Sequence, residues 1–193
     1  NWLEDGIAEL VFDAPAWKLF YEQGYEDTTV EEIIELSGTS KGSFYHYFDG
    51  KDALLSTLSS LFDEKYEELT GLLTPEMTAM EQLLFLNREL FHMIEDSISL
   101  DLLARLYSTQ LTTNGEKHLL DHNRIYYKLL RKIIAKGQAE GQLSSRSNVN
   151  EMVKLYALCE RALLYDWCLC AGEYALTEYS AKVLPGFLSS FLP

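Results

Sequence analysis

Apolar residues recur three and four positions apart along almost the whole chain, and this spacing restricts the fold to helices. Near the N-terminus, Phe12, Ala16, Leu19 and Phe20 share one face of a helix. The sequence shows no alternation of apolar and polar residues of the kind that marks a half-buried strand, and no internal repeat. The pattern therefore predicts an all-α protein.

Capping and breaking residues divide these helices into two size classes. Thr29 and Glu32 have the spacing of a capping box, and Gly24, Gly38 and Gly50 each follow a predicted short helix. Three short helices are thus expected in residues 1–50. Longer helices are expected over about 51–71, 76–97, 99–112, 116–139, 149–171 and 176–191. The pattern predicts about nine helices, arranged as a small head (1–50) and a larger body (51–193).

One proline interrupts the first apolar stripe. Pro15 lies between Phe12 and Phe20, and a proline inside a helix removes a backbone donor and crowds the preceding turn. We therefore expect the first helix to begin properly near Pro15.

Composition favours a soluble cytoplasmic protein with no membrane contact. Apolar residues make up 47% of the 193 residues, enough for a full core. No apolar run approaches the ~18 residues of a membrane span, and the acidic N-terminus lacks the layout of a signal peptide. Cys159, Cys168 and Cys170 are odd in number and closely spaced, which argues against disulfides and favours a reducing compartment.

The stretch SGTSKGSFYHYFDGK, residues 37–51, is unusually rich in aromatic rings. The helices predicted over 29–37 and 40–48, joined by a glycine-containing turn, have the proportions of a helix-turn-helix, whose second helix lies in the DNA major groove. Periodicity places Phe44 and Phe48 in the core. Tyr45 or Tyr47 could instead pack against the first helix. The outward residues are Lys41, Ser43, Tyr45, His46 and Tyr47, whose polar tips suit phosphates and bases.

The run FYEQGYEDTTVEEIIELSGTSKGSFYHYFDGKDALL resembles the N-terminal DNA-binding domain of the TetR family of transcriptional regulators. The motifs LF-x3-GY-x2-TTV, SKG-x-x-Y and YF-x-x-K-x-x-LL occur in order, whereas the body matches loosely, through its helix count and the stretches GQAEGQL and LLYDWCLCAGEYAL. The resemblance implies a homodimeric repressor that binds a palindromic operator and is released by a small-molecule effector. It implies DNA contacts by Thr29, Ser40, Lys41, Gly42, Ser43, Tyr45, His46, Tyr47 and Lys51.

Within this set, two kinds of contact are expected. Phosphate contacts are assigned to Tyr45, Tyr47, Thr29 and Lys51. Thr29 and Lys51 lie at helix N-termini, which favour a phosphate. The better candidates for base edges are Lys41, Ser43 and His46.

Charge argues against strong DNA binding. The chain carries a net charge of −14, and residues 1–60 contain three lysines, no arginine and twelve carboxylates, a net charge of −9. Because counterion release scales with cationic contacts, we expect weak nonspecific binding or a basic arm before Asn1. An alternative function is an effector- or protein-binding dimer whose DNA binding is weak or lost because of the acidic head. The sequence contains no nucleophile elbow, phosphate loop or cofactor motif, so an enzyme is not expected.

The body offers candidates for dimerisation and for effector binding. Apolar stripes in the last two helices predict a four-helix interface with a second copy, although both stripes could be intrachain core. The predicted interface residues are Met152, Tyr156, Cys159, Leu163, Val183 and Phe187. The predicted effector contacts are Phe62, Tyr66, Phe91, Tyr107, Tyr127 and Trp167.

Isolated charges in apolar segments leave two readings open. Arg88, Glu89, Arg105, Glu160 and Arg161 are each either a surface residue or a polar anchor for a ligand. His118 and His122 have a spacing that could hold a metal on one helix face, but no third ligand is near in the sequence, so no metal site is predicted.

Overall fold

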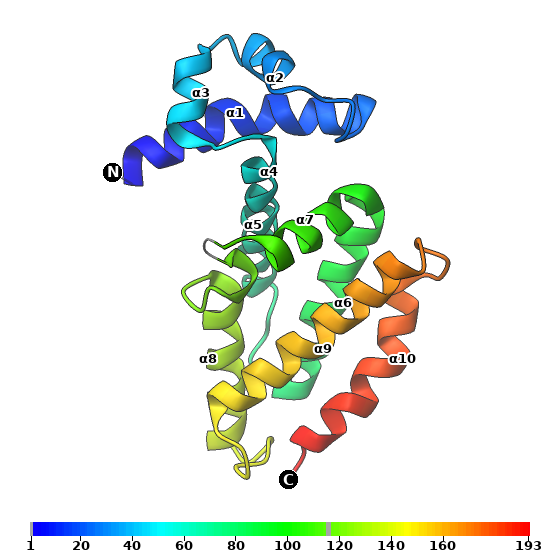
Figure 1. Ribbon diagram of the computed structural model, residues 1–193. Helices are drawn as coiled ribbons and strands as arrows, with labels where there is room; N and C mark the ends of the chain where they lie inside the picture. Colours follow the sequence, from blue (N-terminus) through cyan, green and yellow to red (C-terminus); the bar gives the residue numbers. More distant parts are fainter. Residues whose placement is uncertain (1, 115–116) are drawn as a thin grey trace. The chain divides into compact units, whose positions relative to one another are not determined.

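The computed structural model describes the backbone of residues 2–114 and 117–193, and side chains within these ranges other than those of 2–10 and 56. All regular structure in the described residues is helical, which confirms the predicted class (Figure 1). The helices are α1 (Trp2–Gln23), α2 (Val30–Ser37), α3 (Lys41–Tyr47), α4 (Lys51–Leu54), α5 (Leu58–Thr70), α6 (Ala79–Ser97), α7 (Leu100–Thr112), α8 (Ile125–Ala139), α9 (Val149–Leu169) and α10 (Leu176–Leu188), with short 3₁₀ turns at Leu55–Thr57, His118–Leu120 and Ser189–Phe191.

The head has an aromatic core shared by α1 and α3. The Phe12 ring meets Phe44 and Phe48 edge-on, with ring centroids 5.4 and 5.7 Å apart. Such edge-to-face pairs contribute about 0.5–1.5 kcal/mol beyond the burial of their surface. The indole N–H of Trp17 donates to Thr57 Oγ1 at 2.9 Å and joins α1 to the turn after α4. The periodicity had assigned all three phenylalanines to the core, and this is confirmed.

Helix α1 continues through Pro15, so the expected start near that residue is wrong. Phe12 and Ala16, one on each side of the proline, are 1% and 0% exposed. Burial of both residues on one face stabilises a continuous helix, because a break at Pro15 would displace one of them from the core. Gly24 ends the helix at φ +90°, as predicted.

Two further predicted helices are shorter or less regular than expected. The segment 51–71 is divided by the 3₁₀ turn Leu55–Thr57; α4, this turn and α5 together make up the predicted fourth helix. The segment 116–139 becomes helical only at Ile125, because the Asp121 carboxylate accepts the Asn123 N–H at 2.8 Å and closes a turn there. Residue 116 lies outside the described residues.

The chain divides into two compact units. One holds the first sixty residues together with Asp101–His118, and therefore contains most of α7; the other holds Leu61–Leu100 and Leu119–Pro193. The predicted domain division at residue 50 stays a prediction. In the second unit, α6 packs against α8 and α10, and α9 packs against α8 and α10 (Figure 1).

A glycine permits the close approach of α6 to α8. A Cβ atom at Gly137 would lie 2.6 Å from the Ala79 Cβ and 2.8 Å from a methyl carbon of Leu143, so any larger residue there would force the helices apart. No helix among the described residues is long and apolar enough to cross a membrane.

Candidate DNA-recognition surface and ligand-binding body

The turn between α2 and α3 is held by caps at both ends. Thr29 Oγ1 accepts the Glu32 N–H at 3.2 Å, and the Glu32 carboxylate accepts the Thr29 N–H at 2.8 Å, so the predicted capping box is confirmed. Gly38 ends α2 at φ +67°, the left-handed region that glycine tolerates. Ser40 Oγ then accepts the Ser43 N–H at 3.1 Å and starts α3. Local hydrogen bonds therefore define this turn.

Helix α3 separates its aromatic rings into two sets. Phe44 and Phe48 are 0% and 9% exposed, whereas Tyr45 and Tyr47 are 46% and 37% exposed. This burial pattern is the one that periodicity predicted, and the exposure of both tyrosines disfavours the alternative in which one of them packs against the first helix. Their contact with DNA stays a prediction. On the same helix Lys41, Gly42 and His46 are exposed and Ser43 is half-buried.

Lys41 already has a partner on α2. Its ammonium donates to the Glu31 carboxylate at 3.0 Å, and both side chains are about two-thirds exposed. The hydrogen bond raises the pKa of Lys41 and lowers the pKa of Glu31. Because exposed ion pairs contribute little to stability, an acceptor on a DNA base edge can replace Glu31 as the partner of Lys41 at small cost.

Lys51, the third lysine of the first sixty residues, is bound to the backbone. Its ammonium donates to the carbonyl oxygens of Tyr25 at 2.7 Å, Thr28 at 3.0 Å and Glu26 at 3.2 Å, and it lies 4.3 Å from the centre of the Tyr25 ring. An ammonium has three N–H donors, and all three have a protein acceptor here. Lys51 therefore holds the loop between α1 and α2, and a phosphate contact would have to compete with these bonds.

The same loop is held by α7. Arg105 pairs with Glu26 and lies 5.7 Å from the centre of the Tyr25 ring. Tyr25 donates its hydroxyl hydrogen to Asp52 on α4, and burial together with this hydrogen bond raises the pKa of Tyr25. Arg105 was expected to be either a surface residue or an anchor for a ligand. The structure shows it half-buried and ion-paired with Glu26, in the unit that contains the first sixty residues. Sequence reasoning missed this contact because its partners are far apart along the chain.

Most of the predicted effector contacts lie in the core of the body. Phe62, Tyr66, Phe91, Tyr127 and Trp167 are buried, and Tyr107 is half-buried in the unit that contains the head. The structure brings Tyr66 and Tyr127 together through Tyr126, with ring centroids 5.0 and 4.9 Å apart. The Trp167 indole donates to the Tyr174 carbonyl at 2.9 Å. Effector contact by these residues stays a prediction.

A buried carboxylate lies at the centre of the body. Glu160 is 4% exposed and accepts hydrogen bonds from the Tyr126 hydroxyl at 2.5 Å and from the Asn87 amide at 2.7 Å. The Ser180 hydroxyl on α10 donates to the side-chain amide oxygen of Asn87, Oδ1, at 2.6 Å. Burial raises the pKa of Glu160, and the hydrogen bonds from Tyr126 and Asn87 oppose the rise. Of the two readings left open for Glu160, the surface one is wrong.

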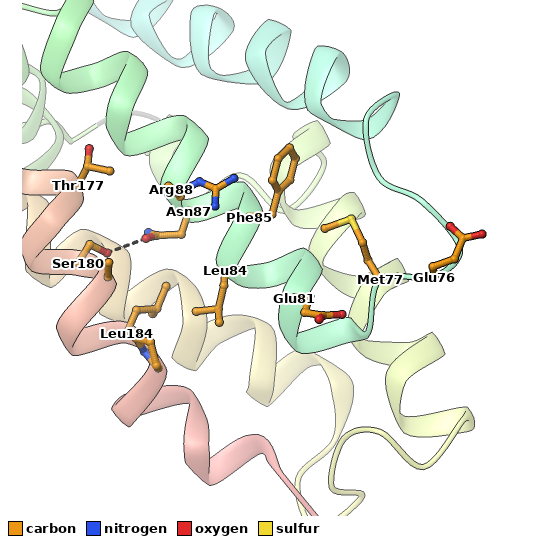
Figure 2. Close-up of a pocket in the computed structure, with 12 residues that line it drawn as sticks. Glu76, Met77, Glu81, Leu84, Phe85, Asn87, Arg88, Thr177, Ser180 and Leu184 are labelled. Carbon is orange, nitrogen blue, oxygen red and sulfur yellow. Dashed lines mark hydrogen bonds between the residues drawn. The ribbon is translucent and has the colours of Figure 1, made fainter.

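Two hollows open on the body. A groove of about 570 Å³ lies between α6 and α10, and Figure 2 shows the Asn87–Ser180 hydrogen bond among its lining residues. A cleft of about 680 Å³ is lined by residues of α8 and α9 and of the segments before them. Both volumes lie in the range of small-molecule sites. The groove is lined by Met77, Leu84, Phe85 and Leu184 among others, and the cleft by Leu120, Tyr127, Lys154, Leu155, Ala157 and Arg161 among others.

A family model described as "Bacterial regulatory proteins, tetR family" matches residues 14–58, which contain the helix-turn-helix. Residues 14–58 are therefore similar to the DNA-binding segment of TetR-family regulators. The model describes regulatory proteins.

An individual relative matches part of the chain. The chain is 42% identical over 60 residues to the uncharacterized HTH-type transcriptional regulator YuxN of Bacillus subtilis (strain 168), over 31% of this chain and 21% of that protein. The match thus spans about a fifth of the length of this curated relative.

Solved structures extend the similarity of fold to the body. Thermus thermophilus FadR, a TetR-family transcriptional repressor in complex with lauroyl-CoA, matches with a TM-score of 0.77 and 24% identity, over 96% of this chain and 95% of that chain. Bacillus subtilis FadR in complex with stearoyl-CoA matches with a TM-score of 0.71 and 20% identity, over 94% and 98% of the two chains. The predicted fold, a helix-turn-helix head on a helical body, is confirmed.

The predicted dimer residues face inward for the most part. Met152, Tyr156, Cys159 and Leu163 are at most 7% exposed within the single chain, whereas Val183 and Phe187 are half-buried. The stripe on α9 therefore includes residues of the chain's own core, which was the alternative left open. Dimerisation itself stays a prediction. The large apolar side chains that α9 and α10 expose are Leu158, Tyr165, Leu169 and Tyr179.

The remaining candidate groups have structural explanations. Cys159, Cys168 and Cys170 are free thiols, and burial raises the pKa of Cys159 and of Cys168 to about 11, which disfavours the reactive thiolate. The His122 ring stacks on Tyr127 with centroids 4.6 Å apart. Among the described residues, no three metal-ligating side chains lie together.

Proposed function

We propose that the chain is a ligand-responsive transcriptional repressor that binds a palindromic DNA operator as a homodimer and leaves it when a small-molecule effector binds. One observation carries this proposal: α3 presents a row of exposed polar and aromatic side chains from a capped helix-turn-helix, within the segment matched by the TetR family. Tyrosine, histidine, serine and lysine tips are suitable donors and acceptors for phosphates and base edges.

The contacts support different roles for the proposed DNA-binding residues. Lys41, Ser43 and His46 would read base edges, and Tyr45 and Tyr47 would bind phosphates. Gly42 adds no side chain between the helix and the DNA. The side chains of Thr29, Ser40 and Lys51 already bond within the head, so their main contribution would be to hold α2, α3 and the α1–α2 loop in place.

Two copies would associate through α9 and α10. These helices expose Leu158, Tyr165, Leu169 and Tyr179, and large apolar side chains grouped on neighbouring helices favour association. A two-fold dimer would present two copies of α3 about one DNA turn apart, ~34–36 Å, which matches a palindromic operator.

The effector is proposed to be an acyl-CoA or a related acyl compound. This class is supported by the two FadR structures, which contain lauroyl-CoA and stearoyl-CoA and resemble the chain over nearly its whole length. The body has two hollows of suitable size.

The test is a titration of DNA from the chain's own promoter region by the purified protein at ~50 mM salt, against a scrambled duplex. The account predicts tighter binding to the promoter DNA by one dimer, and dissociation of that complex on addition of lauroyl-CoA. Equal binding to both duplexes would overturn the assignment of a specific regulator.

A second candidate function has its own support. Lys51 donates to three backbone carbonyls and Lys41 to Glu31, while the first sixty residues carry a net charge of −9. An effector-binding or protein-binding dimer without DNA affinity would show lauroyl-CoA binding and no preference between the two duplexes.

A further inference from the structure

The cleft lined by α8 and α9 collects cationic side chains in a chain that is strongly acidic. Lys154 and Arg161 lie two turns apart on α9 and both line the 680 Å³ cleft. The net charge of the chain is −14, so its long-range field repels anions. A local group of cations is the arrangement that attracts an anion in spite of such a field.

Neither of these two cations has a carboxylate within ion-pair distance among the described residues, in contrast to several other cations of the body. Lys65, Lys136, Lys182 and Arg124 each pair with an aspartate or glutamate. Among the described residues, neither Lys154 nor Arg161 forms an ion pair, and the hydrogen bond recorded for Arg161 goes to a neutral group, the Tyr127 hydroxyl, at 3.1 Å. The charge of Arg161 lowers the pKa of the neighbouring Glu160, whose carboxylate is held by Tyr126 and Asn87. An anion in the cleft would give the half-buried guanidinium a direct ionic partner.

Apolar side chains line part of the cleft, and the polar residues His122, Asn148 and Asn150 also line it. Tyr127 and Ala157 are 2% and 1% exposed, and Leu155 is half-buried beside them on α9. Leu120 is 48% exposed at the opposite wall. Cationic side chains next to apolar side chains suit a ligand that has an anionic group on a hydrocarbon chain. Glu151 also lines the cleft, and its charge opposes binding of such a ligand.

We propose that this cleft binds an amphipathic anion, an acyl chain with a carboxylate or phosphate group, through Lys154 and Arg161. The inference rests on the proposed function in naming this anion as the effector; binding itself does not depend on DNA. An anion bonded to Arg161 would act on two neighbours. Arg161 donates to the Tyr127 hydroxyl, which donates to the Leu119 carbonyl at 2.8 Å, and Arg161 follows the buried Glu160 in the sequence. Occupancy of the cleft would therefore reach the turn before α8 and the polar centre of the body.

The test is a calorimetric titration of the full chain, without DNA, with laurate, lauroyl-CoA and dodecanol. Both anions are expected to bind, and the uncharged dodecanol is expected to bind at least about fivefold more weakly, the value of one ~1 kcal/mol charge contact. The stronger of the two anions identifies the head group as carboxylate or phosphate. Equal binding of dodecanol, or no binding of either anion, would overturn the proposal.

Charge variants give the test a sign. Lys154→Gln is expected to weaken laurate binding about fivefold, and Glu151→Gln to strengthen it by a similar factor. The matched control is Lys182→Gln on α10, a lysine that pairs with Glu178 outside the cleft; it should leave laurate affinity unchanged. Equal effects of the Lys154 and Lys182 variants would place the anion elsewhere.

Failure of this inference differs from failure of the proposed function. If the chain binds laurate in this cleft but shows no preference for promoter DNA, the anion site stands and the proposed role as a regulator is wrong. If lauroyl-CoA releases the promoter DNA equally from the wild type and from Lys154→Gln, the role as a regulator stands and the site in this cleft is wrong.

Discussion

The head and the body use their cationic side chains in opposite ways. In the head, Lys41 pairs with Glu31 and Lys51 bonds to three backbone carbonyls, although this is the part proposed to bind a polyanion. In the body, Lys154 and Arg161 line a cleft and have no carboxylate within ion-pair distance among the described residues. The net charge of the chain therefore does not tell which surface receives an anion; the partners of each cation do.

The two regions also differ in what stabilises them. The α2–α3 turn is defined by caps between residues three positions apart, Thr29 with Glu32 and Ser40 with Ser43. The body has at its centre a polar network that joins α6, α8, α9 and α10 through Asn87, Tyr126, Glu160 and Ser180. Four predictions test this comparison.

The largest expected effect is in the body. Glu160→Ala would leave the Tyr126 hydroxyl and the Asn87 amide buried without their acceptor, at a cost of ~3 kcal/mol in the free energy of unfolding. Denaturation in urea measures this loss. The control is Glu178→Ala, an exposed glutamate of α10 paired with Lys182, which should change the same free energy by less than ~0.5 kcal/mol. Equal effects would show that the network contributes no special stability.

The next effect separates Lys41 from Lys51. Lys51→Ala removes three hydrogen bonds from one ammonium and is expected to cost ~2 kcal/mol of stability. Lys41→Ala removes an exposed ion pair and should cost less than ~0.5 kcal/mol. Thermal unfolding of the DNA-free protein distinguishes them. If Lys51→Ala melts like the wild type yet loses DNA affinity, Lys51 contacts phosphate directly and its structural role is wrong.

The recognition surface should respond in affinity and not in stability. Lys41→Ala and Tyr45→Ala are each expected to weaken operator binding about tenfold with little change in melting temperature, because both side chains are exposed. Glu31→Gln frees Lys41 and removes a negative charge, so affinity should rise. Fluorescence anisotropy with labelled operator measures all three. Unfolding of the Tyr45 variant would show that this ring is part of the core.

The smallest effect concerns pH. Because burial raises the pKa of Glu160, the folded chain holds that proton more tightly than the unfolded chain. Its contribution to the free energy of unfolding therefore falls as pH rises from about 4.3, the ordinary glutamate value, to the raised folded value. Exposed carboxylates with a lowered pKa, such as Glu81, have the opposite sign. The difference in free energy of unfolding between the wild type and Glu160→Gln isolates the contribution of Glu160. This difference should decrease as pH rises over this window, and a constant difference would contradict the prediction.

The sequence predicts well what depends on neighbours along the chain. The burial of Phe44 and Phe48, the exposure of Tyr45 and Tyr47, and the caps at Thr29 and Ser40 all follow from spacing within one or two turns. The family motifs in the head are equally local. For this reason the helix-turn-helix and its outward residues could be predicted before the structure was known.

Features that depend on distant contacts could not be predicted. A glutamate in an apolar stretch has the same sequence signature on a surface as in a core, and Glu160 is buried because Asn87 and Tyr126 supply donors from other helices. The path of α1 through Pro15 likewise depends on burial of Phe12 and Ala16 against other helices of the head. The stripe on α9 was visible, but not which of its residues the chain buries by itself.

The central claim is that the head binds DNA through a polar aromatic surface with one exchangeable lysine on each α3. The salt dependence of operator binding tests it most directly. Two Lys41 contacts in a dimer predict a slope of log K against log salt of about −2, reduced towards zero by Lys41→Ala. A slope of about −6 or steeper, or one unchanged in the Lys41 variant, would contradict the account.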